Sequence, residues 1–476
     1  MTLQHMNCTK TMPVECVLPC ASSNRVVDRF GILEDACEDS DGTVSFWLLL
    51  RKLLNRNITT WLDLLDLLET VSFTLRGSSS VAGDYGSLRL AVENETSFFT
   101  NIWPSILRFA VALPESFTTG RIQKLVPYQT LNLSQQQCAS LVAHQFLCSF
   151  ESPRSDFYDF SVWYDSNQRH PAAVSAYLKS LFAYFYLRGN QNSDGLRAQA
   201  VEFCLWTTDF DMQLDRVTNP STHCLKDLQL SKITTKILNS HSTECHKIDH
   251  SGKAGAVVVS ANKDIGFGQS ATQEELHMGA APEACVAVLF TPQLKDDQAL
   301  SINSAQPIVQ FHGQRRNISW IVHDPPVGGG RLLFMDALEI DLADDILPKP
   351  EQTHDALLPD LLASNIKREL TKSYAAFTSW PQTADSTVFT GQWGCGAFNG
   401  EPTVKLLLLW TAASLAGRRL QVLFDEAERE YARSFEKLIE RVSSQSVSDI
   451  MSLLLSVPKT TQRLGVMQWL DESLNI

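Results

Sequence analysis

The second half of the chain contains short apolar segments separated by polar breaks and by stretches with a helical pattern. Strands are expected at 201–206, 254–262, 284–290, 307–311, 331–338 and 418–424. Several of these segments are continuously apolar, as is expected when helices cover both faces of a sheet. Helices are expected between them at 366–377 and 404–417, and after them at 427–442 and 447–457. Strands that alternate with helices predict a three-layer α/β domain.

The first half differs, because its apolar residues recur at the spacing of helices. Helices are expected at 46–56, 59–71, 103–113 and 173–189, and within 132–150. Thr59 or Thr60 is the expected N-cap of the second helix, and Ser134 is the expected N-cap within 132–150. The polar, glycine-containing stretch 189–195 separates the two halves. The sequence therefore predicts a mainly helical domain at 1–190 and an α/β domain at 191–476.

The net charge limits the partners of the chain. The 476 residues carry a net charge of −13, and the sequence pI is about 5.3. We therefore expect no broad basic surface that follows nucleic-acid phosphates, and a polyanion would have to be recognised locally, by backbone amides and a few cations. The longest apolar run, 406–417, is too short to cross a bilayer, and the first residues lack the apolar stretch of a signal peptide. We expect a soluble intracellular protein.

The cysteines favour free thiols over a disulfide framework. There are 11 of them, an odd number, and none forms a C-x-x-C pair. His241, Cys245, His246 and His250, with Cys224 upstream, are the group that most suggests a metal. Their spacing does not match a structural zinc site, so we expect no bound metal.

The first segment that could carry chemistry is 256–279. A predicted buried strand ends at Asn262, a glycine-containing loop follows at 266–268, and Glu274 and Glu275 lie in the first turn of a predicted helix. Ligands of open α/β sheets bind at the carboxyl ends of strands, where one carboxyl could protonate a leaving oxygen and its neighbour could orient a sugar hydroxyl. The structural alternative is that acidic residues simply favour the first turn of a helix through its dipole.

The second segment is 390–405, which has four glycines before a predicted helix. Backbone N–H groups of such a loop, together with the helix N-terminus, can hold a phosphate. The alternative is a turn-rich loop with core aromatic residues. A third glycine-rich segment, 327–330, lacks the Lys-Ser/Thr of a phosphate-binding loop and leads into a strand, so we interpret it as a connection.

Both segments resemble motifs of the eukaryotic type of poly(ADP-ribose) glycohydrolase. The signature of that family is a glycine-rich loop followed by Gln-Glu-Glu, which stands here at 273–275 behind Ala261-Asn262 and the glycines of 266–268. A second family block, TGNWGCGAFGG, is similar to TGQWGCGAFNG at 390–400. In the first half, 103–107 and 132–150 look like parts of the family's accessory domain. The resemblance extends from about residue 45 to about residue 460.

The resemblance implies a macrodomain, a three-layer α/β/α fold with a mixed sheet, preceded by a helical accessory domain. It implies hydrolysis of the O-glycosidic bonds between ADP-ribose units, without a metal or an organic cofactor. The expected partners are poly(ADP-ribose) and ADP-ribosylated proteins, with no nucleic acid and no membrane. The expected state is a monomer in the nucleus, the cytoplasm or both, with a place in the DNA damage response.

The family's functional residues can be assigned to matching positions. Glu275 would protonate the leaving ribose oxygen through an oxocarbenium-like transition state, Glu274 would hold ribose hydroxyls, and Asn262 would bind the same ribose. Ile248 and Asp249 would contact the adenine. The expected pyrophosphate and adenosine contacts are Gly394, Cys395, Gly396, Ala397 and Phe398. The remaining expected substrate-binding residues are Gly266, Gly268, Gln273 and Gln392.

The sequence departs from the family pattern at several positions. Phe267 interrupts the run of glycines, and the spacer before the glutamates is shortened to 269–272. We therefore expect a shorter or differently shaped loop over the diphosphate and the catalytic ribose. Gln392 stands where the family has Asn, and Val259 stands where it usually has an acidic residue. The family's adenosine-side tyrosine has no counterpart in 307–320, where Phe311 or Arg315 is the candidate replacement.

Three functional classes follow from these observations. A hydrolase is favoured because both glutamates are retained. A macrodomain that binds ADP-ribose or its polymer without cutting it is the alternative, and the altered glycine loop favours it. An interaction scaffold based on the helical half has no positive signal beyond the helices. For a hydrolase, the acidic charge balance suggests a preference for terminal units of the polymer.

Overall fold

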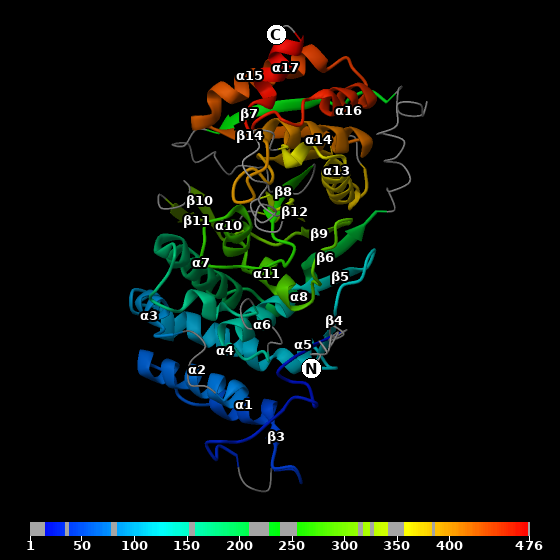
Figure 1. Ribbon diagram of the computed structural model, residues 1–476. Helices are drawn as coiled ribbons and strands as arrows, with labels where there is room; N and C mark the ends of the chain where they lie inside the picture. Colours follow the sequence, from blue (N-terminus) through cyan, green and yellow to red (C-terminus); the bar gives the residue numbers. More distant parts are fainter. Residues whose placement is uncertain are drawn as a thin grey trace, which may run out of the picture.

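The computed structural model describes residues 15–33, 38–77, 83–151, 158–208, 228–238, 255–312, 318–323, 328–340, 357–382 and 386–474. Figure 1 shows the helices α1 to α6, coloured blue to cyan, at one end of the molecule and the C-terminal helices, in orange and red, at the other end, with the strands of the main sheet between them. In the described part of the chain, no helix has the length and apolar character needed to cross a membrane.

The main sheet has eight strands in the order β5-β6-β9-β12-β8-β13-β14-β7. β12, β8, β13, β14 and β7 run parallel to one another, whereas β5, β6 and β9 continue the sheet in antiparallel pairs. The bounds are β5 (Thr130–Ser134), β6 (Ala200–Thr207), β7 (Ile233–Leu238), β8 (Gly255–Ala261), β9 (Gln298–Asn303), β12 (Arg331–Asp336), β13 (Thr387–Thr390) and β14 (Arg419–Asp425). The sheet is thus mixed.

Each face of the main sheet is covered, as the residues of β8 illustrate. Val257 and Val259 belong to the hydrophobic core shared with the helical half, whereas Ala256 and Val258 belong to the core shared with the C-terminal helices. This alternation follows from the two-residue period of a strand. The first face is covered by α10 (Gln273–Ala280) and α11 (Pro282–Cys285), and the second by α13 (Ala363–Thr378), α14 (Pro402–Leu415), α15 (Arg429–Val442), α16 (Val447–Ser456) and α17 (Val466–Leu474). The three-layer α/β/α architecture is confirmed.

The helical half packs directly onto the first face of the sheet. Its helices are α1 (Phe46–Leu54), α2 (Trp61–Arg76), α3 (Gly86–Glu93), α4 (Trp103–Val111), α5 (Leu113–Ser116), α6 (Gln135–Phe146), α7 (Pro171–Gly189) and α8 (Ser193–Ala198), with single turns η2 (Phe98–Ile102) and η3 (Phe160–Trp163). The guanidinium of Arg188 on α7 donates to Glu283 on α11 at 2.8 Å, and both side chains are almost fully buried. The two halves therefore share one core.

The remaining strands form small antiparallel pairs. β1 (Glu15–Val17) pairs with β4 (Arg121–Gln123), β2 (Arg25–Val26) with β3 (Val44–Ser45), and β10 (Val309–His312) with β11 (Ser319–Val322). The short helical turns of the second half are η5 (Val286–Leu289), η7 (Pro359–Leu361) and η8 (Glu426–Glu428).

Both predicted N-caps are confirmed. Thr60 caps α2 and Ser134 caps α6, each through a capping box in which the side chain at the third helical position hydrogen-bonds the cap residue's backbone N–H. The domain boundary at residue 190 stays a prediction, although β5, at 130–134, lies within the first predicted domain and hydrogen-bonds the main sheet.

One strand prediction is wrong. The segment 284–290 forms the end of α11 and the turn η5, because a short, fully buried apolar run has no periodicity that separates strand from helix. The strand predicted at 307–311 is confirmed as β10, which forms a separate two-stranded sheet with β11 beside the main sheet. The strands β5, β7, β9 and β13 are not indicated by the apolar pattern of the sequence, because they are short and have mixed composition.

Candidate active site

Three parallel strands bring the candidate residues to one edge of the sheet. β12, β8 and β13 are adjacent and parallel, so the loops that follow them, 337–340, 262–272 and 391–401, begin at the same edge. The loops after β12 and β13 are joined by a hydrogen bond from the Ile340 N–H to the Phe398 carbonyl at 3.3 Å. The structure thus brings together the two motifs that the sequence analysis identified separately.

Gln273 connects α10 to the central strand β8. Its carboxamide oxygen accepts from the Ser260 N–H at 3.0 Å, and its NH2 donates to the Val258 carbonyl at 3.0 Å. The pairing of β13 with β8 stops at Val257. The Gln273 side chain therefore satisfies backbone groups of β8 beyond that point, which fixes the start of α10 against the strand.

Glu274 closes the loop that follows β8. Its side chain is only 7% exposed, and its two oxygens accept from the backbone N–H groups of Asn262 and Gly266, each at 2.9 Å. Burial raises the pKa of the Glu274 carboxyl to about 8, although the same two N–H groups lower it. With both oxygens bound to backbone amides, Glu274 determines the shape of the loop.

Glu275 lies in the first turn of α10 and is partly exposed. One oxygen accepts from the Thr272 N–H at 3.0 Å and from the Thr272 hydroxyl at 2.8 Å, and the other accepts from the Ser270 N–H at 3.2 Å. Thr272 and Glu275 form a capping box at the start of α10. Glu275 therefore stabilises the helix N-terminus, which is the structural alternative expected for an acidic residue in the first turn.

Asn262 is exposed at the end of β8 and lies close to the loop after β12. Its side-chain oxygen accepts from the Asp264 N–H at 3.0 Å, and its amide nitrogen is 3.5 Å from a carboxylate oxygen of Glu339. An exposed side-chain amide at this edge can donate to a ligand hydroxyl.

The loop 391–401 folds back on itself around two glycines. Gly394 has φ +74°, and a Cβ there would lie 2.5 Å from the Cβ of Ala337. A Cβ on Gly400 would lie 2.6 Å from Cε of Lys405, and the Gly400 N–H donates to the Gly394 carbonyl at 2.9 Å. Both glycines are therefore required by the packing of the loop.

Gly396 differs from these two glycines. A Cβ on Gly396 would meet nothing within 4 Å, and both Gly396 and Ala397 are exposed. Within the described residues, no acceptor is found for the backbone N–H groups of Gly396, Ala397 and Phe398, whereas the Cys395 N–H donates to the Gln392 carbonyl at 3.1 Å. Open space and free backbone donors at one turn are what an anion requires.

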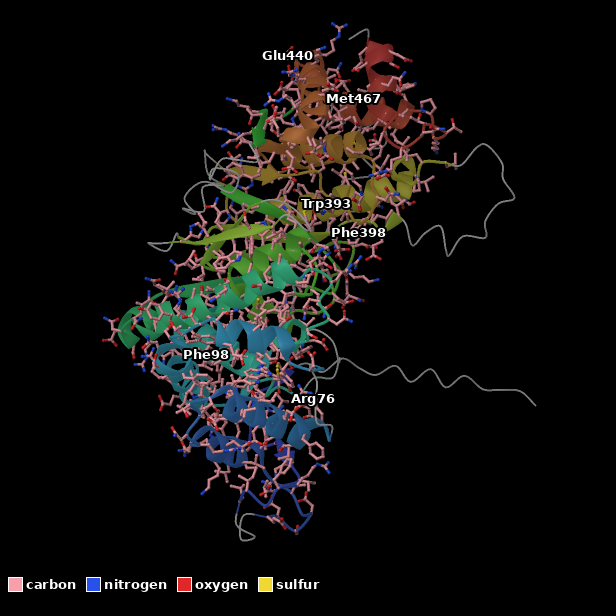
Figure 2. The ribbon with its side chains drawn as sticks, turned by 90° about the vertical axis from the view of Figure 1, so that its left-hand side faces the viewer. Arg76, Phe98, Trp393, Phe398, Glu440 and Met467 are labelled. Atoms are coloured by element: carbon pink, nitrogen blue, oxygen red, sulfur yellow. The ribbon has the colours of Figure 1, made fainter. Side chains whose placement is uncertain are left out.

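Aromatic side chains support this loop from the inside. Figure 2 labels Trp393 and Phe398 at mid-height of the molecule, between the helices of its two ends. Trp393 is 1% exposed, and its indole N–H donates to the Met335 carbonyl at 2.9 Å. Phe398 is half-buried and packs against the core of the C-terminal layer. Trp393 thus anchors the loop to β12.

Lys405 lies beneath the loop and was missed by the sequence analysis. It is 1% exposed, its ammonium contacts a carboxylate oxygen of Glu369, and it lies 3.6 Å from Asp360 and 5.2 Å from the centre of the Trp393 ring. Asp360 accepts from the Glu401 N–H at 3.2 Å. The signal in the sequence is Lys405 as the one charged residue of the helix 402–415, which is otherwise uncharged and mostly apolar, since lysine is almost never fully buried unless it is paired.

A second set of buried charges supports the loop after β12. Arg368 contacts Asp336 and donates to Glu369 at 2.7 Å, and the ammonium of Lys372 lies 2.7 Å from Asp336. Glu369 also accepts from the Leu338 N–H at 2.9 Å. The backbone of the loop is therefore held by a network of ion pairs below the edge of the sheet.

Several candidates lie outside the described residues: Ile248, Asp249, Arg315 and the group of Cys224, His241, Cys245, His246 and His250. Phe311 is described and is 4% exposed, with its ring in edge contact with Tyr177 at a centroid distance of 5.6 Å. Phe311 therefore packs in the core between the two halves of the chain.

Comparisons with known proteins agree with this arrangement. A family model described as "Poly (ADP-ribose) glycohydrolase (PARG), Macro domain fold" matches residues 227–430, and its companion, described as the helical domain, matches residues 90–204. The two models together cover about two thirds of the chain. One model matches part of the helical half and the other matches most of the α/β half. The matched ranges contain every described residue of the candidate site.

Individual relatives carry the same family name. The chain is 28% identical over 362 residues to poly(ADP-ribose) glycohydrolase 1 of Caenorhabditis elegans, covering 73% of this chain and 42% of the relative. It is 26% identical to glycohydrolase 2 of the same organism, covering 69% and 64%. The chain thus spans less than two thirds of either relative. It is also similar to a solved glycohydrolase of Deinococcus radiodurans in complex with ADP-ribose, with 15% identity, coverage of 51% and 95%, and a TM-score of 0.33.

Proposed function

Because this chain belongs to the poly(ADP-ribose) glycohydrolase family, we propose that it hydrolyses the ribose–ribose O-glycosidic bonds of poly(ADP-ribose) and releases ADP-ribose. The observation that carries the proposal is the meeting of the two motifs at one sheet edge. The paired glutamates follow β8. The loop 391–401 follows the adjacent strand β13, and its amides at 396–398 have no acceptor among the residues that the structure describes. A carboxyl and an anion-binding turn at the same edge of a sheet suit a substrate that contains both a glycosidic bond and a diphosphate.

In this proposal, Glu275 is the general acid and Glu274 is the positioning group. Both oxygens of Glu274 are engaged by backbone amides in the interior, whereas Glu275 is partly exposed. Glu275 gives its proton to the leaving ribose oxygen while the C–O bond breaks and the sugar carbon becomes oxocarbenium-like. Water then attacks that carbon and returns a proton to Glu275. Asn262 binds the ribose hydroxyls, and the amides of 396–398 bind the diphosphate.

The test is incubation of the purified protein with labelled poly(ADP-ribose), with the products separated by chromatography. Free ADP-ribose is the expected early product, because the proposal includes a preference for terminal units. Early products dominated by long fragments would contradict that preference. Polymer that is bound but never shortened would contradict the hydrolase itself.

That last outcome would favour the second candidate function, a macrodomain that binds ADP-ribose or its polymer without cutting it. The specific observation in its favour is the capping box of Glu275, whose carboxylate accepts hydrogen bonds from Thr272 and Ser270. A general acid must leave these partners, or share them, to reach a substrate oxygen. The release of ADP-ribose separates the two functions directly.

Substitution of Gly396 by Ala is expected to weaken ADP-ribose binding about tenfold with little change in stability. The added methyl group meets no protein atom within 4 Å, so it occupies the space proposed for the diphosphate. Gly394→Ala is the matched comparison, because its φ of +74° and its contact with Ala337 predict a stability loss of about 1–3 kcal/mol. Calorimetric titration and thermal unfolding measure the two effects. Unchanged affinity in Gly396→Ala would place the diphosphate elsewhere.

A further inference from the structure

The loop between Asn262 and Thr272 is attached to the helical half by an aromatic side chain. Phe267, which interrupts the glycines, is 1% exposed. Its ring centre lies 5.1 Å from that of Phe160 and 5.2 Å from that of Trp163, two residues of the turn η3. Trp163 in turn packs against Tyr177 of α7 at 5.2 Å. Phe267 is therefore a core residue of the helical half, although it belongs to the loop of the α/β half.

Hydrogen bonds from the helical half fix the backbone of the same loop. The Trp163 indole N–H donates to the Gly268 carbonyl at 2.8 Å, and the Tyr177 hydroxyl donates to the Ser270 carbonyl at 2.9 Å. In the opposite direction, the Gln269 side-chain amide donates to the Val162 carbonyl at 3.1 Å. These contacts hold three successive residues of the loop, 268–270.

The last of these residues leads directly to the glutamate of the proposed mechanism. Ser270 accepts from Tyr177 through its carbonyl and donates through its N–H to a carboxylate oxygen of Glu275 at 3.2 Å. Two hydrogen bonds thus connect a side chain of the helical half to the Glu275 carboxylate. A shift of the Ser270 backbone would move one of the partners that determine where this carboxylate lies.

We propose that Trp163, Tyr177 and Phe267 are positioning residues, through which the helical half holds the loop that orients Glu275 for hydrolysis. The proposal rests on the proposed role of Glu275. It accounts for Phe267 between the glycines of the loop, because the buried side chain of Phe267 restricts the loop backbone by packing against Phe160 and Trp163. It also assigns the helical half a part in the reaction, since small displacements of a catalytic group cost large factors in rate.

The test uses variants that remove one hydrogen bond and keep an aromatic ring at the position. Trp163→Phe removes the donor to Gly268, and Tyr177→Phe removes the donor to Ser270. Trp410→Phe is a matched control, because the Trp410 indole is equally buried and donates to the Ser231 carbonyl at 2.8 Å, but belongs to the core on the opposite face of the sheet. Tyr164→Phe is the control for the tyrosine, since its hydroxyl donates to the Phe146 carbonyl at 2.7 Å.

Two measurements are made on all four variants in the full chain. The kcat for ADP-ribose release should fall about tenfold in Trp163→Phe and Tyr177→Phe relative to their controls, with KM within about twofold. Hydrogen exchange of the amides at 266–272 should be about tenfold faster in these two variants, and unchanged in the controls. If these side chains had only a structural role, thermal stability would fall equally in the variants and the controls, and each variant would have the same kcat as its control.

Equal exchange at 266–272 in Trp163→Phe and Trp410→Phe would overturn the proposal, whether or not the wild type is active. Faster exchange with an unchanged kcat would overturn the catalytic part, because the loop would be anchored without consequence for Glu275. A wild type that releases no ADP-ribose would instead remove the proposed function. The two failures are thus seen in different measurements.

Discussion

Replacement of Glu275 by Gln is expected to lower the kcat for ADP-ribose release by about 10²- to 10⁴-fold, the contribution typical of a general acid. Gln has nearly the same shape as Glu but cannot give a proton to the leaving oxygen. Because the diphosphate and the adenosine are bound by other residues in the proposed site, the Kd for ADP-ribose should change by less than about threefold. Product release under saturating polymer and calorimetric titration with ADP-ribose measure these two quantities.

The capping box makes it possible to change Glu275 to Gln with little loss of stability. Gln serves as well as Glu at the third helical position of such a box, so the bonds from Thr272 to this side chain can be kept in part. A stability loss of less than about 1 kcal/mol is therefore expected. Asp449→Asn in α16 is the control, because Asp449 has the same place in the capping box of Ser446, far along the chain from the site. It should lose similar stability and no activity.

Glu274→Gln gives the comparison that separates the two neighbouring carboxyls. Its NH2 group would face a backbone N–H, either of Asn262 or of Gly266, so one hydrogen bond of the loop is lost. We expect weaker binding and lower stability, with a smaller loss of kcat than in Glu275→Gln. The reverse ranking would make Glu274, whose pKa is raised to about 8 by burial, the proton donor.

The sequence predicted most reliably what is decided locally. The N-caps Thr60 and Ser134 follow from a hydroxyl residue before an apolar helical pattern, and the structure has both. The buried strand that became β8 follows from its continuous run of β-branched residues. The opposite case is 284–290, which is equally apolar and forms α11 and η5, because Pro282 starts a helix there and burial on all sides removes the period.

Side-chain contacts across the chain could not be predicted from local patterns. Gln273 was expected to bind substrate, and its amide hydrogen-bonds β8 at Ser260 and Val258. Whether it also touches a ligand stays a prediction. Trp163 lies 105 positions before the carbonyl it binds. No spacing rule connects two such residues, since their contact depends on the docking of the helical half onto the sheet.

The second large effect is expected from replacing Lys405, the buried lysine under the loop 391–401, and it concerns both stability and ligand binding. Substitution of Lys405 by Met should destabilise the protein by about 3–5 kcal/mol at neutral pH, because Glu369 and Asp360 would remain buried without this cation. The Kd for ADP-ribose should rise at least tenfold, since Asp360, which accepts from the Glu401 N–H at the end of the loop, would lose its cation. Lys179→Met, which breaks the partly exposed pair with Glu95, is the control and should cost about 1 kcal/mol or less.

The pH dependence of this deficit identifies its cause. Burial raises the pKa of Asp360 above its unfolded value, and Lys405 opposes that rise, so Lys405→Met should raise the pKa of Asp360 further. A carboxyl with a raised folded-state pKa binds more protons folded than unfolded, so stability falls as the pH rises through that pKa. The deficit of Lys405→Met in chemical denaturation should therefore grow as the pH rises from the unfolded pKa of Asp360 through its raised folded-state pKa. A second substitution, Asp360→Asn, removes the buried carboxylate that has lost this cation and should restore part of the stability. A deficit that is independent of pH and unrelieved by Asp360→Asn would mean that the loop is supported by packing around residue 405 and not by the charge of Lys405.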